Sequence, residues 1–103
     1  MDAIIYKTDN ETIKLSADMA DVMEAADASL TGVSVTGVDS GLTSAAALIT
    51  GATSSGLVIT ATFAGGVDGE DYVVRLRGTG NSSGAVREKV YEIRNRSTLV
   101  GAL

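Results

Sequence analysis

The most informative turn of the chain lies within residues 63–78, FAGGVDGEDYVVRLRG. It contains three glycines and three carboxylates. Before it, residues 57–63 alternate between apolar and more polar side chains, as a half-buried antiparallel strand requires. After it, residues 72–78 alternate in the same way, with two arginines on the polar face. The turn is therefore expected to connect two strands of a β-structure.

The same period of two recurs along the rest of the chain. It predicts strands over 11–17, 31–38 and 87–95, and a weaker strand around Leu48. The sequence GTGNSSG at 78–84 is typical of a hairpin turn. Short strands about every ten residues, separated by turn signals, predict one all-β domain over 1–103, an antiparallel β-sandwich of about seven strands.

One segment has a helical pattern. Ser16 or Asp18 can cap a helix, and the apolar residues that follow share one helical face. These apolar residues are Met19, Val22 and Met23. We expect a short helical excursion near residues 18–26.

The two ends of the chain leave alternatives open. AIIYK, within 1–10, predicts either an additional edge strand or an extended arm that frays or orders on a neighbouring subunit. STLVGAL, within 96–103, is an uncharged apolar stretch. It is predicted to be an arm that either frays or orders on a neighbouring subunit.

The composition excludes several kinds of chemistry. The chain has no Cys and no His, so a disulfide, a thiolate metal site, a thiol nucleophile and a Ser-His-Asp triad are all excluded. No apolar run approaches the roughly 20 residues of a membrane span, and the first residues lack the pattern of a signal peptide. We expect a protein that is made in the cytoplasm and is not an enzyme.

Charge is polarised along the sequence. Residues 1–71 contain eleven acidic and two basic residues, whereas residues 72–103 contain two acidic and six basic residues. The net charge of −5 argues against nucleic acid as the main partner. If the acidic excursion and the basic strands lie on different sides of the sandwich, they suit head-to-tail assembly. The candidate contacts are Asp18, Asp21, Glu24, Arg75, Arg77, Arg87, Lys89 and Arg94.

The glycine-rich turn admits three interpretations. GGVDGEDYV is similar to the calcium-binding nonapeptides of repeat β-helices, but that motif needs tandem copies and the chain has one. Catalysis by paired carboxylates requires different environments, whereas three carboxylates on a solvated turn would all stay ionised. We therefore expect neither a metal site nor a catalytic site here.

The third interpretation is a structural corner. Three glycines can adopt positive φ, Asp68 can accept backbone hydrogen bonds, and Tyr72 opens the next strand. This arrangement resembles the tyrosine corner of immunoglobulin-like sandwiches, with Val74 at the position of the second disulfide cysteine. The corner residues are Gly65, Gly66, Asp68, Gly69 and Tyr72.

Residues 11–95 resemble a family of small virion proteins of tailed bacteriophages. The resemblance rests on an apolar strand, GG-x-D-G-x-x-Y, an alternating strand, a glycine hairpin and a last strand with Arg/Glu alternation. It implies an Ig-like structural adaptor at the head-to-tail interface or tail, which attaches fibres or neighbouring rings. It implies portal, adaptor, tail or fibre subunits and copies of itself as partners, a location in the virion, and no cofactor, membrane or small-molecule substrate.

A second functional class is a carbohydrate-binding or adhesive Ig-like module. Sugar sites usually need an aromatic platform. The sequence offers Tyr6 and Tyr91 as the candidate exposed aromatic residues for it.

Overall fold

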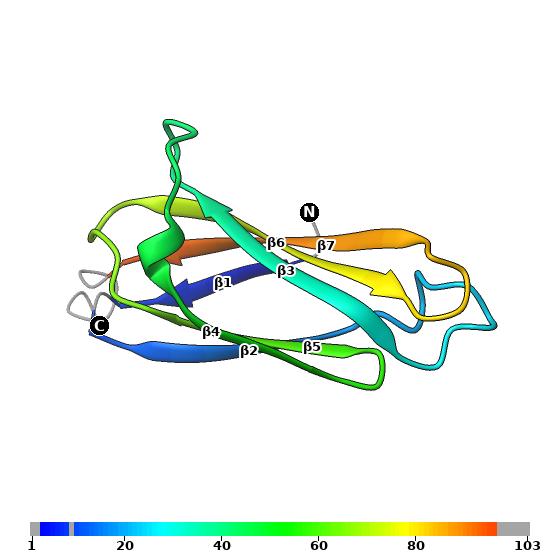
Figure 1. Cartoon of the computed structure of the whole chain (residues 1–103). Helices are drawn as coiled ribbons and strands as arrows, with labels where there is room; N and C mark the ends of the chain where they lie inside the picture. The colour runs from blue at the N-terminus through cyan, green and yellow to red at the C-terminus, as the bar shows by residue number, and fades with distance from the viewer. Residues whose placement is uncertain (1–2, 9, 97–103) are drawn as a thin grey trace.

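The computed structural model describes residues 3–8 and 10–96, which form two β-sheets packed face to face (Figure 1). One sheet has the strand order β1-β7-β6-β3 and the other has the order β2-β5-β4. The strands of the described residues are β1 (Ala3–Lys7), β2 (Thr12–Asp18), β3 (Leu30–Val38), β4 (Ile49–Ser55), β5 (Val58–Ala64), β6 (Asp71–Gly80) and β7 (Val86–Asn95). The prediction of an all-β sandwich is confirmed.

The alternation read from the sequence matches the side chains that fill the core. On β5, Ile59, Ala61 and Phe63 are buried, and the residues between them are partly exposed. On β6, the apolar positions are buried, whereas Arg75 and Arg77 are exposed. The core is therefore formed by the facing sides of the two sheets, as period-two patterns require.

Strand β1 is an edge strand of the larger sheet. It runs parallel to β7, in a register that extends from Ala3 opposite Tyr91 to Lys7 opposite Asn95. Of the alternatives for AIIYK, the additional edge strand is the one observed. The 96–103 stretch lies outside the described residues except for Arg96.

The helical excursion predicted near 18–26 is wrong. Strand β2 continues to Asp18, whose Oδ1 accepts a hydrogen bond from the Ala20 N–H at 3.0 Å and so starts a turn. Met19 is fully buried, and its N–H donates to the Leu57 carbonyl at 2.8 Å. These tertiary contacts hold residues 19–28 as successive turns, because the burial of Met19 and its strand-like hydrogen bond override the local helical pattern.

A second difference concerns Leu48. The predicted strand around it is displaced: Leu48 is buried and ends the short 3-10 helix η1 (Ala46–Leu48), and β4 begins one residue later. Among residues 3–8 and 10–96, no helix is long and apolar enough to cross a membrane.

Candidate functional site

The glycine corner lies at one end of the sandwich, between β5 and β6 (left in Figure 1). Gly65, Gly66 and Gly69 have φ of 74°, 92° and 86°. Tyr72 is 5% exposed, and its hydroxyl accepts a hydrogen bond from the Val67 N–H at 2.8 Å. The positive φ angles and the tyrosine hydroxyl bonded across the turn are both confirmed.

The corner is also bonded to the end of the last strand. The Gly69 N–H donates to the Asn95 carbonyl at 2.7 Å, and the Asn95 N–H donates to the Glu70 carbonyl at 3.0 Å. Beside these bonds lie two buried polar side chains, Lys7 and Asn95, which our sequence reasoning missed. Asn95 ends the alternating stretch 87–95, but nothing in the local sequence marks either residue as buried.

The acidic side chains of the corner do not form a common site. Glu70 accepts hydrogen bonds from the Ser40 hydroxyl and backbone N–H, and the hydroxyl holds the pKa of Glu70 below its usual value. Asp71 forms an ion pair with Arg96 at 2.6 Å, and Asp68 is exposed. Within the part of the chain that the structure describes, no three acidic side chains are grouped to hold a metal ion.

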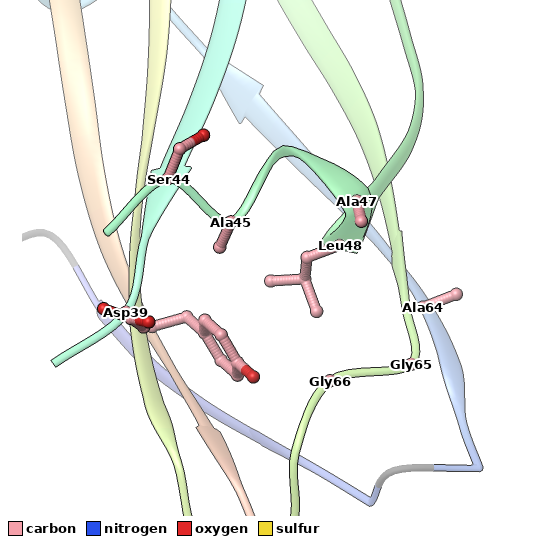
Figure 2. Close-up of a pocket in the computed structure, with 9 residues that line it drawn as sticks. Asp39, Ser44, Ala45, Ala47, Leu48, Ala64, Gly65 and Gly66 are labelled. Atoms are coloured by element: carbon pink, nitrogen blue, oxygen red, sulfur yellow. The ribbon is translucent and has the colours of Figure 1, made fainter. Parts of the chain in front are cut away.

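A shallow hollow of about 270 Å³ opens beside the corner (Figure 2). Its lining residues are Asp39, Ser44, Ala45, Ala47, Leu48, Ala64, Gly65, Gly66 and Tyr72. The Asp39 carboxylate, its charged group, accepts hydrogen bonds from the Gly41 and Thr43 N–H groups at 2.9 Å. This carboxylate therefore stabilises the turn at residues 39–43, and the rest of the lining consists mainly of small side chains.

The charged candidates for assembly are paired within the chain. Arg75 and Arg77 each contact Glu88 at 3.1 Å across the β6–β7 ladder. Arg94 contacts Glu92, donates to the Tyr6 hydroxyl at 3.2 Å and lies 5.9 Å from the Tyr6 ring centre. The exposed pairs contribute little stability, but they leave fewer free charges for a neighbour.

The condition for head-to-tail assembly, that the acidic excursion and the basic strands lie on different sides, is not met at the start of β7. Arg87 contacts Glu24 at 3.2 Å, and Lys89 contacts Asp21 at 2.9 Å. Lys89 also donates to the Asp18 carbonyl at 2.8 Å. The sandwich brings residues 19–28 and the start of β7 to the same end of the molecule (right in Figure 1).

The same end contains a buried carboxylate. Asp27, 6% exposed, accepts hydrogen bonds from the Ser82 N–H, the Ser83 N–H and the Ser83 hydroxyl, at 2.9, 2.9 and 2.7 Å. In return, Asn81 Oδ1 accepts from the Ala28 and Ser29 N–H groups. These reciprocal hydrogen bonds fix residues 27–29 to the β6–β7 hairpin. We call this set of hydrogen bonds the Asp27 clamp.

Replacing Tyr72 with Phe should destabilise the fold by about 1 kcal/mol, because the Val67 N–H loses its acceptor. The loss falls at the lower end of the usual range because this hydrogen bond is only partly buried, so water can reach the Val67 N–H when the hydroxyl is removed. Urea denaturation of the wild-type and Tyr72→Phe proteins measures it. Equal midpoints and slopes would show that the hydroxyl does not stabilise the corner.

The Asp27 clamp predicts a specific loss of stability in acid. The Ser83 hydroxyl, followed by the Ser83 N–H, lowers the pKa of Asp27 in the folded state. A lowered folded-state pKa contributes stability that is present above the unfolded pKa and is lost as pH falls through the folded pKa. Asp27→Asn, which keeps an oxygen acceptor, should therefore show a smaller fall in urea midpoint than the wild type below about pH 4. Parallel pH profiles for the two proteins would contradict this assignment.

Comparisons with known proteins do not assign the chain to a family: no family model matches it, and no curated protein matches its sequence.

Proposed function

We propose that the protein is an Ig-like structural adaptor of a tailed bacteriophage particle, at the head-to-tail interface or tail, where it attaches fibres or neighbouring rings. The resemblance of residues 11–95 to small phage virion proteins supports this role. Its partners would be other virion subunits and further copies of itself.

The strand order supports the Ig-like part of the proposal. In an Ig constant-type sandwich, strands B, E and D are neighbours in one sheet, and strands C, F and G in the other. Here β2-β5-β4 and β3-β6-β7 take these places, and β1 pairs with the last strand. Tyr72 at the start of β6 and the buried Val74 two residues later occupy the positions expected for a tyrosine corner without a disulfide.

The observation that carries the assembly role is the edge strand β4. Six of its seven residues are exposed, and among residues 3–8 and 10–96 it pairs with a strand on one side only, β5. Residues 40–67, which include β4 and β5, contain no charged residue. Natural proteins usually protect exposed edge strands with charges or Pro. An uncharged, exposed edge is instead suited to receive an additional strand through main-chain hydrogen bonds.

The occupant that fits this edge best is the 97–103 segment of a second copy. Its sequence, STLVGAL, is uncharged and has seven residues, the same length as β4. Pairing between the segment of one copy and the edge of the next is a heterologous contact, which generates a ring when the rotation closes. A single added strand makes a small contact, which should be weak in free solution and stable on the particle, where several contacts act together.

Deletion of the gene from the phage genome tests the proposal. Electron microscopy of the resulting particles should show heads without attached tails, or tails without fibres, and the wild-type gene supplied in trans should restore them. Particles with normal structure and infectivity would contradict an adaptor role.

The carbohydrate-binding alternative has less structural support. Tyr91 is 8% exposed, which corrects its placement as an exposed aromatic residue, and the exposed Tyr6 is engaged by Arg94. Specific binding of the protein to a glycan array, combined with normal particles after gene deletion, would favour this alternative.

A further inference from the structure

Lys7 and Asn95 form a buried polar pair at the corner end of the sandwich. They lie opposite each other on the adjacent parallel strands β1 and β7, near the two ends of the described chain. Lys7 is 2% exposed and Asn95 is fully buried. A lysine is rarely buried to this degree in a small domain. The pair therefore needs a specific explanation.

The hydrogen bonds hold the two side chains against each other. Lys7 Nζ donates to the carbonyls of Thr8 at 2.6 Å and Gly65 at 2.5 Å, and it lies 3.4 Å from Asn95 Oδ1. Asn95 Nδ2 donates to the same Gly65 carbonyl at 3.3 Å. The lysine nitrogen and the amide nitrogen thus donate to the same carbonyl oxygen.

The neighbouring residues leave little space around the Asn95 side chain. A Cβ placed on Gly66 would lie 2.7 Å from Asn95 Nδ2 and 3.2 Å from both Leu48 Cδ1 and Tyr72 Cε2. The backbone of Asn95 is fixed in addition by its two hydrogen bonds to the corner. The amine of Lys7 and the carboxamide of Asn95 are therefore held close together in a buried site, and the backbone of Asn95 is fixed.

We propose that Lys7 and Asn95 form an intramolecular isopeptide bond. After the Lys7 ammonium has released one proton, the lone pair of Nζ attacks Asn95 Cγ and forms the Nζ–Cγ bond. The Cγ–Nδ2 bond then breaks, and a proton lost from Nζ is transferred to Nδ2, which leaves as ammonia. One amine and one primary amide give one secondary amide and one ammonia, so the step needs no oxidant, reductant or other co-reactant.

Proximity is the main contribution of the fold to this reaction. Holding two reacting groups in contact replaces a bimolecular step by an intramolecular one, which can be worth effective molarities of about 10⁵ M or more. The shared Gly65 carbonyl also places the attacking and leaving nitrogens near each other, which shortens the path of the transferred proton.

The bond would connect positions 88 residues apart, on the first and last strands. A pulling force applied at the two ends of the domain would then pass directly from β1 to β7, without unfolding the residues between them. The chemistry does not depend on the proposed adaptor role, but a component that transmits tension would benefit from it.

Mass spectrometry of the intact, denatured protein tests the bond. The wild type should be lighter than its sequence by one ammonia, and proteolysis should release a branched peptide that joins Lys7 to Asn95. Lys7→Arg and Asn95→Ala should each have the full sequence mass. Lys14→Arg, a control at an exposed position of β2, should keep the loss.

Two results would overturn the proposal. One is a wild-type protein of full sequence mass after prolonged incubation in the folded state, a measurement that needs no variant to fold. The other is an ammonia loss that persists in Lys7→Arg, because that would indicate cyclisation of an asparagine with its own backbone.

Discussion

Replacing Gly66 with Val should cost about 3 kcal/mol or more of folding stability, which is a large share of the total for a small domain. Gly66 has a φ of 92°, a conformation that β-branched residues rarely adopt. Its Cβ would also lie 2.7 Å from Asn95 Nδ2 and 3.2 Å from the Tyr72 ring. Valine therefore adds backbone strain and steric overlap at the same position, and urea denaturation of the variant measures their sum.

Gly69→Val is the matched control. Gly69 has a similar φ of 86°, but no atom lies within 4 Å of a Cβ added there. Its substitution should incur the backbone strain without the overlap, and the loss should be clearly smaller than at Gly66. Equal losses at the two positions would show that the contacts of Gly66 with Asn95 and Tyr72 do not matter for stability.

Replacing Gly80 with Ala should also be strongly destabilising, by about 2 to 3 kcal/mol, although alanine is the smallest possible change. Gly80 is buried at the end of β6, and an added Cβ would overlap the Asp27 carboxylate. Asp27 cannot move aside without weakening its hydrogen bonds to Ser82 and Ser83. Thermal or urea unfolding measures the loss.

Two further variants isolate the cause. Gly78→Ala, on the same face of β6, brings a Cβ within 2.9 Å of the end of the flexible Leu30 side chain and should cost less. In the double variant Asp27→Ala/Gly80→Ala the overlap is gone, so the two losses should be less than additive. Additive losses, or equal losses at Gly78 and Gly80, would contradict the steric explanation.

The strands and the corner could be predicted from the sequence because their signals are local. Alternation along β5 and β6 requires two faces of different polarity, and this is visible within seven residues. The corner could be predicted for the same reason. Glycines at 65, 66 and 69 and a tyrosine at 72 lie within one short segment of sequence. Glycine readily adopts the positive φ that a tight turn needs, and the Tyr72 hydroxyl is close enough in sequence to bond to the backbone of the same turn.

The features that could not be predicted depend on residues far apart in the sequence. Residues 19–28 have a helical pattern, yet the partners that hold them as turns, Leu57 and Ser83, come from other parts of the fold. Likewise, nothing near Lys7 indicates that it will be buried against Asn95, since the two meet through the parallel pairing of β1 with β7. The pairing of Arg87 and Lys89 with Glu24 and Asp21 depends on the same long-range packing.

The proposed adaptor role rests on the uncharged edge of β4, and the incorporation of edge variants into phage particles tests it most directly. Thr53, exposed at the middle of β4, is replaced by Lys, a residue that natural edge strands use to prevent pairing. Val67→Lys, at an exposed position of the corner, is the control for added charge. Each variant is produced together with the wild type during infection, and its ratio to the wild type is measured in purified virions by mass spectrometry. Thr53→Lys should fold but be largely excluded from the particles, whereas Val67→Lys should enter them like the wild type. Equal incorporation of all three proteins, or their absence from the particles, would contradict the account.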